Sequence, residues 1–202
     1  MNEEYKKIIK KYYKEKFLKY GTTSNGVDWN DDESHSHRIQ NLVSHISPDC
    51  YDSILDFGCG YGKMYEILEN IGSKLDYFGY DINEKAIQSA TEINNGGHFF
   101  SKLEEQKSFD HVVANGIFNV SMNISKGGWK KYCYNTIDEM LSLSNKSVCF
   151  NMLTNYVDYE REHLCYFDPK EIFDRYINKN DTCITIKHFN KMYEFIVLIE
   201  KQ

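Results

Sequence analysis

A run of alternating glycines is the feature of this chain best suited to binding a ligand. Gly58, Gly60 and Gly62 follow the short apolar stretch 53–57 and precede apolar residues at helical spacing. Glycines in a turn between a strand and a helix allow positive φ and let a ligand lie directly against the backbone. In a dinucleotide fingerprint the third glycine comes three residues after the second, where this chain has Lys63. The spacing therefore fits a dinucleotide pyrophosphate poorly and indicates a backbone-lined site of another kind.

A carboxylate after the next predicted strand completes the pattern. Asp81 ends the strand-like segment 77–80. At the tip of the strand beside the glycine turn, an acid can accept hydrogen bonds from both ribose hydroxyls of an adenosine. Ile82 next to it can supply an apolar wall for the adenine ring. These two residues extend the predicted site across two neighbouring strand ends.

Taken together, Asp56, the alternating glycines and Asp81 resemble the class I S-adenosylmethionine-dependent methyltransferases, in particular small bacterial members. The resemblance covers roughly residues 52–200 through the order of strands and helices. It implies that the glycine loop holds the methionine part of S-adenosylmethionine (SAM) and that the acid after the second strand holds the ribose. By this resemblance we expect the cofactor-binding residues to be Asp56, Gly58, Cys59, Gly60, Gly62, Asp81, Ile82, Leu103 and Asn115. Within this set we expect Cys59 to pack under the loop rather than act as a nucleophile.

Two segments depart from the usual pattern of that family. Many members place an acid after the third strand to meet the adenine amino group, whereas this chain has Lys102 followed by Leu103, whose backbone would make the contact instead. After the fourth strand, the segment 115–118 lacks the Asn-Pro-Pro-Tyr type of motif found in methylases of base or glutamine nitrogens. A structural turn and a substrate contact are both open readings of Asn115–Gly116.

Methyl transfer from a sulfonium is an in-line displacement, so an enzyme must chiefly align the nucleophile and exclude water. A base is needed only where the nucleophile loses a proton, which leaves the catalytic residues harder to read than the cofactor site. Segments 26–38 and 154–166 can cover the strand ends. They and the loop after the fourth strand supply the catalytic candidates His163, Tyr156 and Asn115 and the substrate-binding candidates Trp29, Arg38, Tyr156, Tyr159 and Arg161. For the arginines, ordinary ion pairing is the alternative reading.

These residues require an α/β fold to position them. The pattern predicts a Rossmann-like, seven-stranded, mostly parallel sheet with flanking helices, a C-terminal antiparallel hairpin and an N-terminal helical cap. Strands are expected at 53–57, 77–80, 98–100, 109–114, 147–152, 183–186 and 193–199. Helices are expected over the first twenty residues, at 32–46 and 64–71, from 83, at 129–141 and from 168. We therefore predict a helical cap or lid over 1–50 and a SAM-binding methyltransferase domain over 51–202, forming one compact unit.

Composition limits the function classes. The 202 residues carry 24 Lys+Arg against 30 Asp+Glu, a net charge of −6, which disfavours a general nucleic-acid binder. No apolar run approaches the ~20 residues of a membrane span. The six cysteines form no Cys-x-x-Cys pair, so we expect no metal site, and the first residues lack a hydrophobic signal core, so we expect a cytoplasmic location. The lysine-rich opening helix is the one basic segment; it reads as a solvated face or as a lid that guides an anionic substrate.

The sequence thus predicts a SAM-dependent methyltransferase acting on a small polar metabolite, at oxygen rather than nitrogen. A nucleotide-linked sugar or a phosphoramidate precursor of a surface polysaccharide is the suggestion that family analogy gives. A protein or RNA methyltransferase, docking through the lysine-rich helix, is an alternative. A non-catalytic partner subunit that binds the cofactor is another, and the oligomeric state is not predicted.

Overall fold

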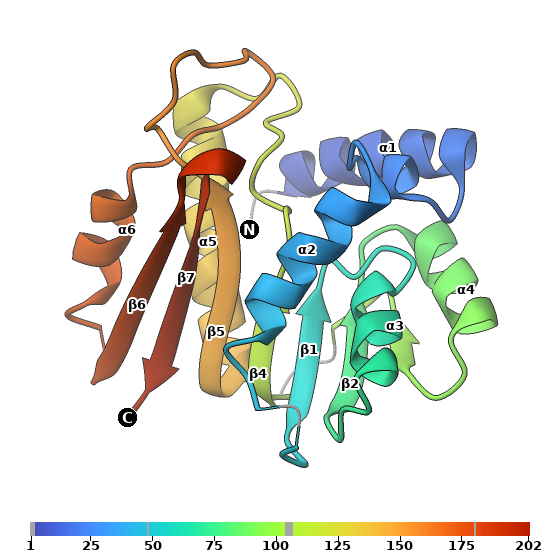
Figure 1. The fold of residues 1–202 in the computed structure, drawn as a ribbon. Helices are drawn as coiled ribbons and strands as arrows, with labels where there is room; N and C mark the ends of the chain where they lie inside the picture. Colours follow the sequence, from blue (N-terminus) through green and yellow to red (C-terminus); the bar gives the residue numbers. More distant parts are fainter. Residues whose placement is uncertain (1–2, 48, 104–106, 180) are drawn as a thin grey trace.

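Seven strands form one sheet in the order β3-β2-β1-β4-β5-β7-β6 (Figure 1). The computed structural model describes residues 3–47, 49–103, 107–179 and 181–202. The strands are β1 (Ser53–Phe57), β2 (Asp76–Tyr80), β3 (His98–Phe100), β4 (Phe109–Ala114), β5 (Ser144–Leu153), β6 (Thr182–Phe189) and β7 (Glu194–Lys201). Pairing is parallel from β3 to β5, and β7 lies antiparallel between β5 and β6. The predicted Rossmann-like sheet with its C-terminal antiparallel hairpin is confirmed.

Six helices and two short 3₁₀ turns accompany these strands in the described residues. The helices are α1 (Glu3–Tyr20), α2 (Asp32–Val43), α3 (Lys63–Asn70), α4 (Glu84–Ile93), α5 (Lys126–Leu143) and α6 (Pro169–Tyr176); the 3₁₀ turns are η1 (Ser24–Val27) and η2 (Asn190–Met192). Helix α2 ends three residues earlier than the predicted Ile46. The Ser44 hydroxyl donates to the Asn41 carbonyl at 2.7 Å, a local bond that competes with continuing the helix. Ile46, beyond the end of the helix, is nevertheless buried in the core.

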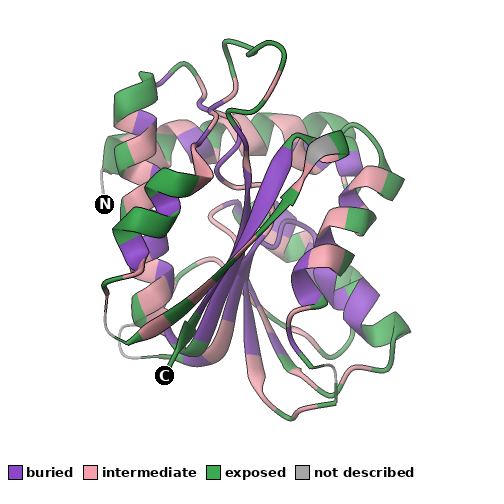
Figure 2. Ribbon diagram, turned by 60° about the vertical axis from the view of Figure 1, so that its left-hand side comes forward, coloured by how far each residue is buried: buried purple, intermediate pink, exposed green. Residues whose placement is uncertain are grey.

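The helices cover the sheet on both faces. Helices α2 and α3 pack Ile39, Leu42, Met64 and Leu68 against one face, and α5 packs Trp129, Ile137 and Met140 against the other. Figure 2 shows the central strands buried between the helices, whereas the edge strand β6 and the helices carry exposed residues. None of the helices in the described ranges is long and apolar enough to cross a membrane.

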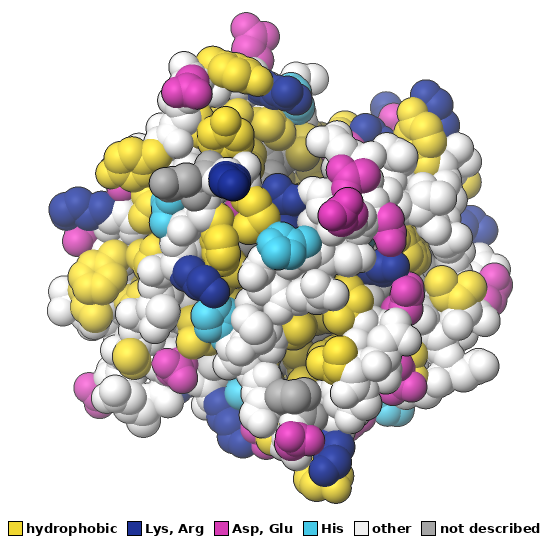
Figure 3. Space-filling model, viewed as in Figure 1, with side chains coloured by type: hydrophobic (Ala, Val, Ile, Leu, Met, Phe, Trp, Pro, Cys, Tyr) yellow, Lys and Arg dark blue, Asp and Glu magenta, His cyan; other side chains and the backbone are white. Residues whose placement is uncertain are grey.

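Helix α1 lies across the carboxyl-end edge of the sheet, above the tip of β1 (Figure 1). Ile9 and Phe17 are its buried residues, and Ile9 joins the same core cluster as the strands. The helix is tied to the start of α4 by a Lys10–Glu84 ion pair of 2.8 Å and by a bond from Asn83 Nδ2 to the Tyr13 carbonyl. In Figure 3 its lysines form the blue cluster at the upper right. Helix α1 therefore covers the edge at which a parallel sheet binds its ligands.

Candidate active site

A cavity of about 610 Å³ opens at the carboxyl ends of β1, β2 and β4, beneath α1 and beside α2. The loops that follow β4 and β5 complete its wall. Of the predicted site residues, those that line the cavity are Trp29, Arg38, Asp56, Gly58, Cys59, Gly60, Asp81, Ile82, Asn115, Arg161 and His163. Its volume lies in the range of small-molecule and cofactor sites.

The glycine turn forms the floor of the cavity. The amides of Gly58 and Cys59 both donate to the Tyr80 carbonyl, at 2.7 and 3.0 Å, which joins the turn to the end of β2. Gly60 has φ +56°, and a Cβ atom there would lie 2.7 Å from Val27 Cγ1. A side chain at that position would be strained in conformation and would collide with η1. The turn is therefore built to keep bare backbone at the surface of the cavity.

Asp81 is fixed at the rim of the turn. Its Oδ2 accepts from the Gly60 amide at 2.9 Å and its Oδ1 from the Asn83 amide at 2.7 Å. Burial raises the pKa of Asp81, and these two backbone bonds oppose the rise. A carboxylate has about four acceptor positions, so both oxygens keep capacity for ligand hydroxyls. The position and the chemistry suit the predicted ribose contact.

Asp56 lies under the turn and is almost fully buried. Burial raises the pKa of Asp56 to about 7; a hydrogen bond from the Tyr77 hydroxyl, 2.8 Å from Oδ2, opposes this, and the charge of Asp81 adds to it. Cys59 is also buried, and its burial raises the pKa of the thiol well above its usual value. The thiol therefore stays protonated and packs under the loop, as its place in the turn suggests.

The loop after β4 carries Asn115, whose side-chain amide lines the cavity. Both Asn115 Oδ1 and Nδ2 are buried, and neither has a hydrogen-bond partner within the described part of the chain. The next residue is held firmly, because the Gly116 amide donates to Asn151 Oδ1 at 2.7 Å. A buried polar group without a partner is rare in a native fold and calls for an explanation. Asn115 lines the cavity, so its amide stands where a bound ligand can supply the missing partner.

Tyrosines on the underside of α1 close the cavity from above. The Tyr12 hydroxyl donates to Asp28 Oδ2 at 2.7 Å, and Lys16 Nζ lies 2.6 Å from Oδ1 of the same residue. Tyr13 lies beside Tyr12 and also lines the cavity. Burial raises the pKa of both phenols, so they stay neutral. Neither tyrosine is among the predicted site residues; two adjacent tyrosines in the predicted opening helix are the signal that could have marked a ligand-facing wall.

Two other cavity tyrosines are not among the predicted site residues, namely Tyr80 at the end of β2 and Tyr132 on α5. The sequence predicts Tyr132 within a helix and Tyr80 within a strand, and nothing in their spacing marks either as a site residue. Burial raises the pKa of Tyr80 to about 12, which keeps this phenol neutral as well. With the α1 tyrosines they give the cavity an aromatic lining with neutral hydroxyls.

The mouth of the cavity carries Arg161 and His163, both exposed, from the loop after β5. That loop is pinned to the loop after β4 by a bond from the Ser121 amide to the His163 carbonyl at 2.9 Å. Tyr156 and Tyr159 come from the same loop but point elsewhere, with 67% and 68% of each residue exposed. The structure thus brings two of these four candidates to the cavity.

Three further predicted residues stand in other settings. Arg38 lines the cavity, but its Nε lies 2.5 Å from Glu194 Oε1, so it is engaged in a buried ion pair. Gly62, at φ +86°, is the N-cap of α3 and does not line the cavity. Leu103 packs against the core cluster beneath the sheet's end. The roles expected of Gly62 and Leu103, like those of the other predicted site residues, stay predictions.

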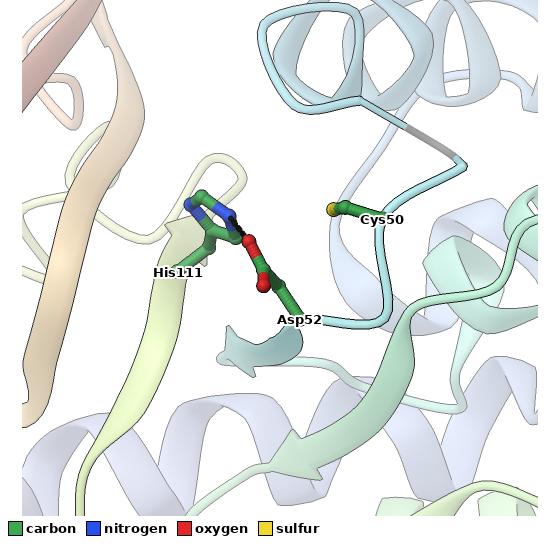
Figure 4. Close-up of side chains that lie close together, drawn as sticks. All are labelled: Cys50, Asp52 and His111. Carbon is green, nitrogen blue, oxygen red and sulfur yellow. Dashed lines mark hydrogen bonds and ion pairs between the residues drawn. The ribbon is translucent and has the colours of Figure 1, made fainter.

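A separate polar cluster lies at the opposite end of the sheet, where β1 begins (Figure 4). Cys50, Asp52 and His111 offer three potential metal-ligand atoms within 4.8 Å of one another. Asp52 already pairs with Lys146 at 2.7 Å and with His111 at 3.1 Å, and the Cys50 thiol donates to the Ser47 carbonyl. We interpret the cluster as a network of ion pairs and hydrogen bonds.

Comparison with known proteins agrees with this geometry. The sequence profile of a methyltransferase domain family matches residues 50–196. The chain is also 32% identical over 154 residues to the Mycobacterium tuberculosis protein named "Putative methyltransferase Rv1506c", covering 74% of this chain and 93% of that one. The chain belongs to the class I SAM-dependent methyltransferases. The enzyme therefore uses SAM as its cofactor.

Solved structures share the fold at low sequence identity. Magnesium protoporphyrin IX methyltransferase from Synechocystis PCC 6803, with bound S-adenosylhomocysteine (SAH), aligns with a TM-score of 0.72 at 13% identity, covering 98% of this chain and 99% of that chain. The plantazolicin methyltransferase BpumL, in complex with a monoazolic desmethylPZN analog and SAH, aligns with a TM-score of 0.59 at 15% identity, covering 99% of this chain and 98% of that chain. In both cases nearly the whole length of this methyltransferase takes part in the match, α1 included.

Proposed function

We propose that this methyltransferase transfers the methyl group of SAM to an oxygen of a small polar metabolite held inside the cavity under α1. The observation that carries the proposal is the continuity of the cavity, which joins the Gly58–Gly60 turn and Asp81 to the unpartnered amide of Asn115. A ligand-sized space with bare backbone on one side and polar groups without partners on the other suits a cofactor and a small acceptor together.

The residues present fit the cofactor at each of its parts. Asp81 keeps acceptor capacity for the ribose hydroxyls, Ile82 offers an apolar wall for the adenine, and the Gly58–Gly60 backbone leaves room for the methionine portion. When bound, SAM supplies an electrophilic methyl group for an in-line displacement. The chain's own part is to hold both reactants and to exclude water, which the tyrosines of α1 do from above.

The wall of the cavity opposite the glycine turn carries the groups that can bind and activate the methyl acceptor. The Asn115 amide can donate to and accept from the acceptor or the cofactor, and His163 at the mouth is the candidate base for an acceptor hydroxyl. Arg161, exposed beside it, can pair with an anionic group on the acceptor. A nucleotide-linked sugar or a phosphoramidate combines such an anionic group with a methylatable oxygen, which keeps this class as our proposed substrate.

An RNA acceptor is less well supported. Several α1 lysines that could contact phosphates are already paired with carboxylates: Lys10 with Glu84 at 2.8 Å and Lys16 with Asp28 at 2.6 Å. Helix α1 covers the cavity, so the strand ends are not open to a macromolecule. We also propose a cytoplasmic location, since all six cysteines, each within the described residues, are free thiols.

Incubation with trideuteromethyl-labelled SAM and fractionated cell extract tests the proposal. We expect mass spectrometry to show a new labelled product in the low-molecular-weight fraction, with one equivalent of SAH released for each methyl transferred. Asp81→Ala serves as the inactive control. Label found only in the protein or RNA fraction would favour the alternative acceptor, and no SAH above that control in any fraction would favour a non-catalytic cofactor-binding subunit.

A further inference from the structure

The loop that follows β4 is part of a closed ring of side-chain and backbone contacts. The Gly116 amide donates to Asn151 Oδ1 at 2.7 Å, and Asn151 Nδ2 donates to Glu194 Oε2 at 3.0 Å. The other carboxylate oxygen of Glu194 lies 2.5 Å from Arg38 Nε. The Arg38 guanidinium lies over the indole of Trp29, 5.0 Å from the ring centroid. We call these five residues the β4-loop ring.

Trp29 closes the ring by contacting the glycine at which it began. A Cβ atom on Gly116, which has φ +74°, would lie only 2.4 Å from Trp29 Cζ2. The indole therefore lies directly on the Gly116 backbone, and no side chain fits between them. The ring joins four segments of the chain: residues 29–38, which run from before α2 into its middle, the loop after β4, β5 and the first residue of β7.

Burial divides the ring into two parts. Asn151 and Glu194 are each 1% exposed and do not line the cavity, whereas Trp29, Arg38 and Gly116 do. A buried ion pair is seldom worth more to stability than apolar side chains of the same size. Stability of the fold therefore gives little reason for the Glu194 carboxylate at this position. A role in fixing the ligand-facing loop after β4 does give a reason, because a fully bonded buried polar network is rigid.

We propose that Glu194 and Asn151 are positioning residues of the methyltransferase, which act through the β4-loop ring to hold Asn115 and Trp29 in place against the cofactor. Asn115 directly precedes the anchored Gly116, so the direction of its unpartnered amide depends on that anchor. The inference rests on the proposed function only for the identity of the ligand that this amide meets.

Nuclear magnetic resonance of the ligand-free protein tests the ring itself. The chain has two tryptophans, so a ¹H–¹⁵N spectrum contains two indole signals, and Trp29→Phe identifies one of them. We expect Glu194→Gln to move the Trp29 signal and to leave the Trp129 signal in place. Glu200→Gln, an exposed position on the same strand, is the matched control and should move neither.

Calorimetric titration with SAH tests the positioning role. We expect Glu194→Gln to weaken SAH binding by roughly 3- to 30-fold, the usual range for a change within a coupling network. Asn151→Ser removes the acceptor of the Gly116 amide and leaves the Arg38–Glu194 ion pair intact. It should weaken SAH binding by a similar factor, and it is the deciding variant if Glu194→Gln does not fold.

The outcomes separate this inference from the proposed function. If the wild type binds SAH while the folded variants bind it less than about threefold more weakly than the wild type, the positioning role is wrong even if the Trp29 signal moves. An unmoved Trp29 signal overturns the ring directly. If the wild type itself fails to bind SAH, the proposed function fails, whatever the spectra show.

Discussion

Replacing Asp81 with alanine gives the sharpest test of the cofactor site. The carboxylate is expected to accept both ribose hydroxyls, and a hydrogen bond to a charged group contributes about 1.5–3 kcal/mol. Two such bonds amount to about 3–6 kcal/mol, and since about 1.4 kcal/mol corresponds to tenfold in affinity, SAH binding should weaken by roughly 100-fold or more. The variant also loses the bonds from the Gly60 and Asn83 amides, so a fall of about 1–3 kcal/mol in the free energy of unfolding is expected as well.

Isothermal titration calorimetry with SAH measures the first effect and urea denaturation the second. Asp76→Ala is the matched control, because Asp76 is an exposed acid at the other end of the same strand. It should bind SAH like the wild type. If Asp81→Ala stays folded and binds SAH with the affinity of that control, the assignment of the ribose site is refuted.

Three further predictions concern the walls of the cavity. Gly60→Ala should lower the free energy of unfolding by about 1–2 kcal/mol in urea titrations, because φ is +56° and the new Cβ would meet Val27 at 2.7 Å. The pKa of Asp56 is raised to about 7, so between about pH 4 and 7 the folded state holds a proton that the unfolded state has released. The contribution of Asp56 to the free energy of unfolding should therefore fall as the pH rises from about 4 to 7 and stay constant above that. Asp56→Asn should remove this pH dependence in urea titrations over the same range. Tyr12→Phe deletes the bond to Asp28 and should speed amide hydrogen exchange in α1, as measured by mass spectrometry, with the core strands unchanged.

Each of these has a control and a contrary result. Gly127→Ala, where a Cβ meets nothing within 4 Å, should not destabilise; equal losses at both glycines would contradict the steric reasoning. A difference between wild type and Asp56→Asn that does not change with pH would mean that the Asp56 pKa is not raised. Unaltered exchange in α1 of Tyr12→Phe would show that the Asp28 contact does not hold the helix.

Much of the fold could be predicted because its signals are local. The strands around the glycine turn are short apolar runs, and Asp168 followed by a proline marks the start of α6 as the structure shows it, with Asp168 accepting from the Lys170 amide. The turn and Asp81 could be placed for the same reason, since both sit at strand ends whose order fixes their neighbours.

The remainder of the site depends on contacts between distant segments. Tyr156 and Arg161 share one polar loop, and only the pairing of that loop with residues 119–121 decides that Arg161 faces the cavity while Tyr156 does not. Glu194 gave no signal at all: in sequence it is the polar first residue of an apolar strand, and its buried partners come from α2 and β5. The tyrosines of α1 likewise became part of the site only because the helix lies across the sheet edge.

A crystal structure of the enzyme grown with SAH addresses the central claim most directly. We expect the ribose hydroxyls within hydrogen-bond distance of both Asp81 oxygens and the homocysteine portion along Gly58–Gly60, pointing toward Asn115. Density for the ligand outside this cavity, or a cavity that stays empty at saturating SAH, would contradict it.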